Sequence, residues 1–323
     1  MSTVAGERSA GAVAPSRSAA RQADGRRPSG RSLGRRLRSE LAGWTFLGPN
    51  LVLLVVFLFV PIVWAAVLSF QHSRGFGTPT WAGIANYTQM LGDAVFWQSA
   101  WNTLVFTVCT VPVELAGGLG LAVLLNSVLP GRTLFRTIIV LPMVISGVAS
   151  GLIATIMFYQ SNGLFNKILT AAGLPTVSWQ SAPVPAMFSV IVVSIWLRLG
   201  FTMIIYLAGL QSISPQLYEA ARIDGATRWQ QFRSVTVPLV GPSTFFLLVM
   251  NVIASFQVFD VIFVMTGGGP GNATSVLVTY AYRNGFQIRE QSYGAAIGIV
   301  ILALTLVFTV IQWLTSRGKD LVE

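Results

Sequence analysis

Residues able to perform chemistry are sparse in this sequence, and they form no catalytic set. The chain has one histidine, His72, and one cysteine, Cys109, so neither an intrachain disulfide nor a cysteine-based metal site is available. Cys109 lies in an apolar run, where we expect a small core residue. The glycines at 267–271 lie outside any G-x-x-x-x-G-K-[ST] phosphate-binding pattern, which the sequence lacks. The sequence therefore predicts no catalytic residue, no metal, no bound cofactor and no ATP binding by this chain.

Two ionisable residues, Glu114 and Arg198, lie inside long apolar runs. Charges are costly in a hydrocarbon environment, so intramembrane ionisable groups are by default functional or paired. Both residues are candidates to line a solute pathway. The alternative is that they pair with each other, with backbone carbonyls or with a partner protein.

A third candidate group recurs every four residues in a later apolar run: Asn251, Ser255 and Phe259. On one continuous helix this spacing places two polar groups and an aromatic ring on the same face, which suits a sugar. Hydrogen bonding between helices is the alternative role for the polar pair. Gln257 and Asp260 are expected to point the other way, with Asp260 serving as a structural cap or gate contact.

The stretch 211–238 is more polar than its surroundings and carries the spacing of two short helices. Ser214 followed by Pro215 is typical of a helix start, with the serine hydroxyl available as a cap. Gly225 can end that helix with a positive φ, and a second helix can begin at Thr227 and run toward Pro238. The sequence predicts a helix, a turn and a helix that project from the membrane.

The elements that must position these residues are transmembrane helices. The chain is 53% hydrophobic and only 10% charged, whereas soluble domains carry about 25% charged residues. Six apolar segments reach the ~20 residues needed to cross a bilayer. They are Trp44–Phe70, Ser99–Val128, Leu134–Tyr159, Val184–Leu210, Leu239–Met265 and Gly294–Thr315. We therefore expect an all-α integral membrane protein with six transmembrane helices.

Basic residues set the expected orientation in the membrane. With the amino terminus in the cytoplasm, 16 basic residues fall on the cytoplasmic side and 4 on the other, which favours both termini inside. Nine of them are arginines in the first 40 residues, which fits contact with anionic lipid rather than nucleic acid. Residues 1–32 are predicted to be a disordered basic tail, 33–43 an amphipathic interfacial helix, 44–316 the membrane domain with the loop 211–238, and 317–323 a cytoplasmic end.

The loop also carries a family resemblance. Glu219-Ala220-Ala221, three residues, Gly225, nine residues and then the run 235–238 (Val-Thr-Val-Pro) resemble the EAA loop of binding-protein-dependent ABC import permeases. The family has Ile and Leu where this chain has the two valines. Phe259-Asp260, followed by the run 265–270 (Met-Thr-Gly-Gly-Gly-Pro), is similar to the first permease subunit of maltose-like and glycerol-phosphate importers.

The resemblance covers residues 44–316 and implies a type I ABC importer permease in the plasma membrane, which forms half of the pathway of a sugar importer. It implies a second homologous permease, two cytoplasmic ATP-binding subunits that hydrolyse the ATP, and an extracytoplasmic solute-binding protein. A polyol or glycerol phosphate is the alternative substrate to a sugar. The residues expected to couple the channel to the ATPase are Glu219, Ala220, Ala221, Asp224 and Gly225. Two other functions stay open, a self-contained secondary transporter and a membrane scaffold without transport.

Overall fold

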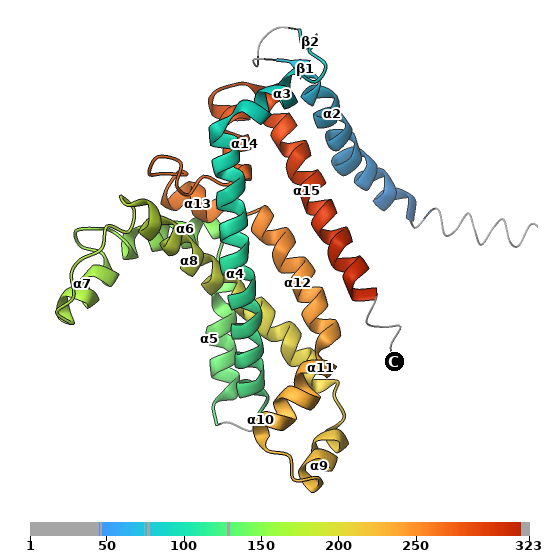
Figure 1. The fold of residues 1–323 in the computed structure, drawn as a ribbon, viewed down its shortest axis with the longest axis vertical. Helices are drawn as coiled ribbons and strands as arrows, with labels where there is room; N and C mark the ends of the chain where they lie inside the picture. Colours follow the sequence, from blue (N-terminus) through green and yellow to red (C-terminus); the bar gives the residue numbers. More distant parts are fainter. Residues whose placement is uncertain (1–44, 46, 74, 76–77, 128–129, 318–323) are drawn as a thin grey trace, which may run out of the picture. The chain divides into compact units, whose positions relative to one another are not determined.

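The computed structural model describes residue 45 and residues 47–73, 75, 78–127 and 130–317 (Figure 1). The predicted tail 1–32 and interfacial helix 33–43 lie outside the described residues, as do positions 318–323 of the predicted cytoplasmic end. The chain divides into two compact units, Met1–Leu58 and Phe59–Glu323. In the first unit, the described residues 47–58 are helical, and the elements that follow lie in the second unit.

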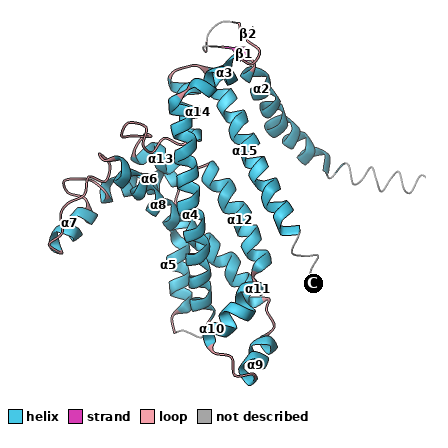
Figure 2. Ribbon diagram, viewed as in Figure 1, coloured by secondary structure: helices cyan, strands magenta, loops and turns pink. Residues whose placement is uncertain are grey.

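The second unit is built almost entirely of helices (Figure 2). In chain order they are α2 (Val60–Ser69), α3 (Ala85–Gly92), α4 (Ala94–Asn126), α5 (Arg132–Val144), α6 (Gly147–Met157), α7 (Leu164–Ala171), α8 (Pro183–Gln211), α9 (Pro215–Ile223), α10 (Arg228–Gln231), α11 (Val237–Leu239), α12 (Gly241–Phe256), α13 (Asp260–Met265), α14 (Leu277–Tyr282) and α15 (Gln291–Arg317). Three described segments are π-helical: η1 (Val55–Phe59), which precedes α2 and has residues 55–58 in the first unit, η2 (Phe232–Thr236) and η3 (Arg283–Gln287). One antiparallel hairpin joins β1 (Gln71–His72) to β2 (Thr80–Trp81), with Gln71 opposite Trp81 and His72 opposite Thr80.

Five of the six predicted apolar segments are confirmed as candidate membrane spans, and the third is a bent pair of helices rather than one straight helix. In the part of the chain that the structure describes, five helical stretches are long and apolar enough to cross a membrane: Leu47–Ser69, Ala94–Asn126, Pro183–Gln211, Gly241–Met265 and Gln291–Thr315. The third segment consists of α5 and α6, which are bent by 102° at the break between them. Ile145 and Ser146 have extended backbone at this break, just after Pro142, which lies inside α5. The single third span expected from the sequence is therefore corrected to a bent pair.

The core of the unit forms where α4 and α8 pack along each other. Gly118 allows the close approach, because a Cβ atom there would collide with the side chain of Thr202. Gly200 does the same for α5, whose Ile139 carbonyl oxygen would lie 2.5 Å from a Cβ at that position. Small residues of this kind let membrane helices pack closely. Cys109 on α4 is exposed, so the expectation that it is a core residue is wrong.

A polar cluster joins three helices at the end of the bundle that carries β1, β2 and α3, here called the hairpin end (Figure 1). Asp93 caps α4 by accepting hydrogen bonds from the amides of Val95 and Phe96. Its other carboxylate oxygen accepts hydrogen bonds from the hydroxyls of Tyr280 on α14, at 2.5 Å, and Tyr293 on α15, at 2.6 Å. The opposite end of the bundle carries α9 and α10, and we call it the loop end.

Candidate functional site

The helix–turn–helix expected between 211 and 238 is present, and hydrogen bonds of its backbone fix the turn. Gly225 has φ +77°, and the amides of Gly225 and Ala226 donate to the carbonyls of Arg222 and Ala221. These two bonds form a Schellman motif, in which a residue with positive φ ends the helix. Ser214 does precede α9, but its side chain makes no capping hydrogen bond, so that part of the expectation is wrong.

The second half of the loop is fixed by side chains. Thr227 and Gln230 form a reciprocal capping box at the start of α10, with Gln230 Oε1 2.7 Å from the Thr227 amide nitrogen. The Tyr218 and Thr236 hydroxyls lie 3.0 Å apart and join α9 to η2. These contacts hold α9 and α10 in one arrangement, so the loop is an ordered structural element rather than a simple connector.

The projection exposes its residues to the surroundings. Glu219, Ala220, Asp224 and Gly225 are exposed, and Ala221 is half-buried. Two residues that the sequence reasoning missed are more prominent: Ile223 is 86% exposed and Trp229 is 67% exposed. Large apolar side chains in a polar loop are the sequence signal for such contact residues, because burying them against a partner surface lowers the free energy.

A second feature lies where two broken spans meet. The break between α5 and α6 is followed by Gly147, and the break between α12 and α13 is followed by Asp260. The two helices that follow the breaks, α6 and α13, pack against each other. Non-helical backbone at membrane depth is tolerated only where it is buried in protein or lines a water-filled cavity.

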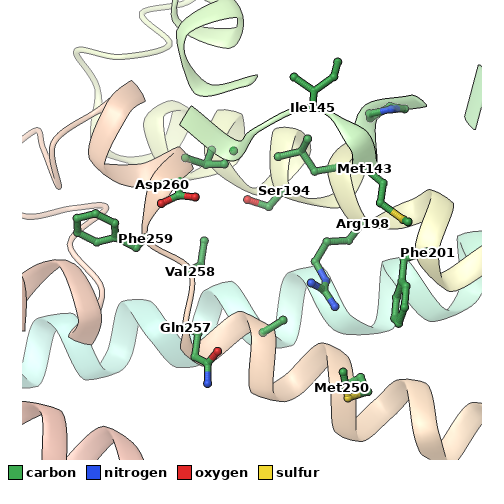
Figure 3. A pocket seen from close by; sticks show the side chains of 15 residues that line it. Met143, Ile145, Ser194, Arg198, Phe201, Met250, Gln257, Val258, Phe259 and Asp260 are labelled. Carbon is green, nitrogen blue, oxygen red and sulfur yellow. The ribbon is translucent and has the colours of Figure 1, made fainter. Parts of the chain in front are cut away.

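Both breaks border a cavity of about 510 Å³, which we call the inner cavity (Figure 3). Its polar side chains are Ser194 and Arg198 from α8, Gln257 from the second break and Asp260 from α13. In Figure 3 Ser194 lies between Asp260 and Arg198. Apolar and aromatic lining comes from Met143, Ile145, Phe201, Met250, Val258 and Phe259, among others.

Arg198 lines the inner cavity, whereas Glu114 lies behind it in the α4–α8 contact. Arg198 is 33% exposed and Glu114 is 3% exposed, with Arg198 Nε 3.8 Å from Glu114 Oε2. The guanidinium also donates a 3.0 Å hydrogen bond to Oδ1 of Asn251 and lies 5.7 Å from the Phe201 ring centre. The pairing that the sequence left open is thus present, and it leaves one side of Arg198 facing the cavity.

The three residues expected on one helix face are separated by the break. Asn251 and Ser255 on α12 are buried and bind neighbouring helices, through the Thr202 hydroxyl at 3.3 Å and the Thr107 hydroxyl at 2.8 Å. Phe259 lines the cavity. Because α12 ends at Phe256, helical spacing no longer applies beyond it. Gln257 and Asp260, expected to point away, therefore line the cavity as well.

Residues 115–319 match the family described as binding-protein-dependent transport system inner membrane component. The chain is a member of that family. The matched part contains the projecting loop, both broken spans and every residue of the inner cavity named above.

Individual relatives are similar to this permease over nearly their whole length. The trehalose/maltose transport system permease protein MalF of Thermococcus litoralis is 34% identical, over 87% of this chain and 96% of its own. The lactose transport system permease protein LacF of Rhizobium radiobacter is 35% identical, over 87% and 95%. Among solved structures, a chain of a bacterial alginate ABC transporter in complex with a pentasaccharide-bound periplasmic protein superposes with a TM-score of 0.79, at 27% identity over 88% of this chain and 97% of that chain. The permease therefore has the fold of ABC importer permeases.

Proposed function

We propose that this permease forms half of the pathway of an ATP-driven sugar importer and that the inner cavity holds the sugar during translocation. One observation carries the proposal: two broken spans border the same cavity, and they contribute polar side chains to its lining. Helix breaks at membrane depth are tolerated where they line a water-filled cavity, which is what a polar solute needs. The relatives named for trehalose and maltose and for lactose support sugars as the substrate class.

The lining of the inner cavity suits an uncharged sugar. Among the described residues that line it, Arg198 is the only cation and Asp260 the only anion, so the ionised lining carries no net charge. Gln257 and Ser194 add hydrogen-bonding groups, and the rings of Phe201 and Phe259 offer faces for the apolar side of a sugar ring. A glycerol phosphate is an anion. In this cavity Arg198 would attract its phosphate, but the carboxylate of Asp260 would repel it.

The projecting loop is the proposed contact with an ATPase subunit. In this proposal Ile223 and Trp229 insert into a groove of the partner, while Glu219, Ala220, Ala221, Asp224 and Gly225 shape the surface around them. ATP is bound and hydrolysed by two such subunits, and this chain binds no cofactor. A second homologous permease completes the pathway, and an external binding protein delivers the sugar.

The proposed orientation places the loop end in the cytoplasm, together with both termini. The basic residues of the loop, Arg222, Arg228 and Arg233, support this orientation, because cytoplasmic segments carry an excess of Lys and Arg. Closure of the ATPase pair then pushes on the projecting loop and shifts the bundle between its inward and outward states.

The experiment is reconstitution of the complex purified from native membranes in mild detergent. We expect an ATP-binding subunit and a second permease to co-purify. Uptake of radiolabelled maltose, trehalose or lactose into proteoliposomes should require ATP and the binding protein. Transport that continues without ATP and follows an ion gradient would contradict the proposal and favour a secondary transporter. Co-purification with an ATPase but without flux of any solute in a broad saccharide and polyol panel would favour a scaffold.

A pair of matched variants tests the cavity. Gln257→Ala removes a hydrogen-bonding group from the lining, whereas Gln98→Ala removes the same group from an exposed position on α4. Loss of one hydrogen bond to a neutral partner costs about 0.5–1.5 kcal/mol, so Gln257→Ala should weaken apparent sugar affinity by roughly 2- to 12-fold. Gln98→Ala should leave it unchanged. Equal apparent sugar affinities of the two variants would show that the sugar does not bind in the inner cavity.

A further inference from the structure

The segment between α6 and α8, residues 158–182, is here called the α7 lobe, and its own hydrogen bonds hold it together. Asn166 of α7 is buried, and its side-chain amide donates to the carbonyls of Gln160 and Val177, at 2.8 and 3.0 Å. Its side-chain oxygen accepts from the Val177 amide at 3.0 Å and from the indole nitrogen of Trp179 at 2.9 Å. One side chain thus joins α7 to the segments before and after it.

Aromatic rings form a small core under α7. The ring centres of Phe158 and Phe165 lie 4.2 Å apart, and Trp179 lies edge-on to both, at 5.4 and 6.4 Å. Gly163, just before α7, has no room for a side chain, because a Cβ atom there would collide with the carbonyl oxygen of Tyr159. These contacts fix how α7 is turned about its own axis.

The surface of α7 divides into three strips along its length, because successive residues of an α-helix are turned by about 100°. The three least exposed residues of the helix share one strip: Phe165, Asn166 and Leu169. Leu164 and Ile168, four residues apart, form an apolar strip and are 48% and 55% exposed. Lys167 and Thr170 form the remaining strip, which is polar and also exposed. An apolar and a polar strip therefore lie next to each other on the outside of the lobe.

The place of α7 in the chain puts it at a membrane surface. It precedes α8, whose other end leads to the projecting loop, so the lobe and the loop lie at opposite ends of this span. The 29 residues of α8 are about 44 Å long, more than the ~30 Å of the hydrocarbon core. Tyr159 and Trp179 flank α7 in the chain, and these residue types are enriched where a membrane meets water.

The helices on either side of α7 also expose apolar side chains. Leu152 and Ile156 are exposed on α6, and Val184 and Phe188 are exposed at the start of α8. The lobe, which Figure 1 shows to one side of α4, thus connects two helices that already face apolar surroundings. An apolar strip beside a polar one matches the two sides of a membrane–water boundary, and this favours a bilayer over a soluble protein as the partner of α7.

We propose that α7 lies flat in the membrane surface as an interfacial anchor. Leu164 and Ile168 insert between lipid acyl chains, and Lys167 and Thr170 face the headgroups and water. The lysine stem lies along the apolar boundary while its ammonium reaches the lipid phosphates.

The anchor has a consequence for α6. The 11 residues of α6 are about 16 Å long, too short to cross the hydrocarbon core, so α6 needs another contact to set its depth. Since α6 packs on α13 beside the inner cavity, the anchor also holds that wall of the cavity in place. This role goes beyond the proposed function and is independent of which solute is carried.

Spin labels on single cysteines, in a Cys109→Ser background, test the anchor. Leu164→Cys and Ile168→Cys carry the label on the apolar strip, and Lys167→Cys and Thr170→Cys are the matched controls on the polar strip. All four side chains are exposed, so the labels displace no packed neighbour.

The complete transporter is placed in nanodiscs of phosphatidylethanolamine and phosphatidylglycerol, and electron paramagnetic resonance measures collisions of each label with oxygen and with a nickel chelate. Oxygen concentrates in hydrocarbon, and the chelate stays in water. The oxygen-to-nickel ratio at positions 164 and 168 should therefore exceed that at positions 167 and 170 by roughly tenfold.

Three results would overturn the proposal. Nickel access at all four positions would show that α7 is surrounded by water. Exclusion of both probes from positions 164 and 168 would show that a protein, such as a second permease, covers the apolar strip. Nickel access that falls at these two positions only after the binding protein is added would assign the strip to that protein. The measurement needs neither sugar nor ATP, so its failure is distinguishable from failure of the uptake that tests the proposed function.

Discussion

Asp260 lies directly over Gly147, where a Cβ atom would stand 2.7 Å from Asp260 Oδ2 and 3.0 Å from Asp260 Cβ. The contact joins the first residue of α6 to the first residue of α13, so it connects the two broken spans at the edge of the inner cavity. The absence of a side chain at position 147 is therefore what allows the two breaks to meet.

The first prediction concerns this contact. Gly147→Ala should lower the thermal stability of the purified transporter and reduce sugar uptake, because overpacking a closed contact costs about 1–3 kcal/mol. The control is Gly120→Ala on α4, where no atom lies within 4 Å of the added Cβ and the alanine favours the helix. Adding Asp260→Ala to the Gly147→Ala variant should restore part of the stability. No difference between the variants at 147 and 120 would show that the contact is not tight in the membrane.

The second prediction separates the two roles available to Gly225. Its φ of +77° costs a β-branched residue about 1–2 kcal/mol, whereas asparagine adopts this region more readily. No atom of the chain lies within 4 Å of a Cβ at this position. Gly225→Val should therefore uncouple ATP hydrolysis from sugar uptake, and Gly225→Asn should do so much less. If both variants lose uptake equally, a partner surface rests on Gly225 and excludes any side chain.

The third prediction is a pH dependence that arises at Asp93. Burial raises the pKa of this carboxyl, but hydrogen bonds from Tyr280, Tyr293 and the amides of Phe96 and Val95 outweigh it and hold the pKa below the ordinary value of 3.8. A lowered pKa stabilises the folded state above 3.8, and the stabilisation is lost as the pH falls through the folded value. Burial, and then the hydrogen bond to Asp93, raise the pKa of Tyr280 to about 12, so its hydroxyl stays a donor through neutral pH.

Asp93→Asn tests this cluster because asparagine can keep the helix cap through its one oxygen, while it removes the charge and puts an NH2 donor where the carboxylate oxygen accepts from Tyr280 and Tyr293. Hydrogen bonds to charged groups contribute about 1.5–3 kcal/mol, so the variant should melt at a lower temperature at pH 7. The difference from the parent should shrink as the pH falls from about 5 toward 3. Asp224→Asn, at an exposed carboxylate on the loop, is the control. A difference that stays constant with pH would contradict the charge-based account.

The fourth prediction addresses the pair formed by Glu114 and Arg198. Glu114 is buried and Arg198 is one-third exposed, so removal of the arginine leaves a buried carboxylate without its partner at a cost below the about 3–5 kcal/mol of a fully buried pair. Arg198→Gln should therefore destabilise the transporter, and the double variant with Glu114→Gln should recover part of the loss. Thermal unfolding of the four proteins gives the coupling energy. A coupling near zero would mean that Arg198 serves the cavity and that its 3.8 Å approach to Glu114 adds nothing.

Local chemistry made much of the loop predictable. Pro215, Gly225 and Thr227 act on backbone within a few residues of themselves, so their types sufficed to predict two helices and the turn between them. The prediction that Ser214 caps α9 was wrong, because a serine before a helix provides a hydroxyl but does not force it to bond to the free backbone amides. Which apolar side chains project furthest, Ile223 and Trp229, depends on how α9 and α10 are held together by the contact of Tyr218 with Thr236.

By itself the sequence determined that the chain is a set of membrane-crossing helices, because the length and the apolar composition of each run can be read along the chain without knowledge of the contacts. It also placed the loop and identified the ionisable residues inside the apolar runs. Only the tertiary structure decided what lines the cavity. Helical spacing grouped Asn251, Ser255 and Phe259, but α12 ends at Phe256, and the break turns Gln257 and Asp260 toward the space that Arg198 shares. Such breaks are stabilised by contacts between distant segments, as between Gly147 and Asp260, and periodicity along one segment does not contain that information.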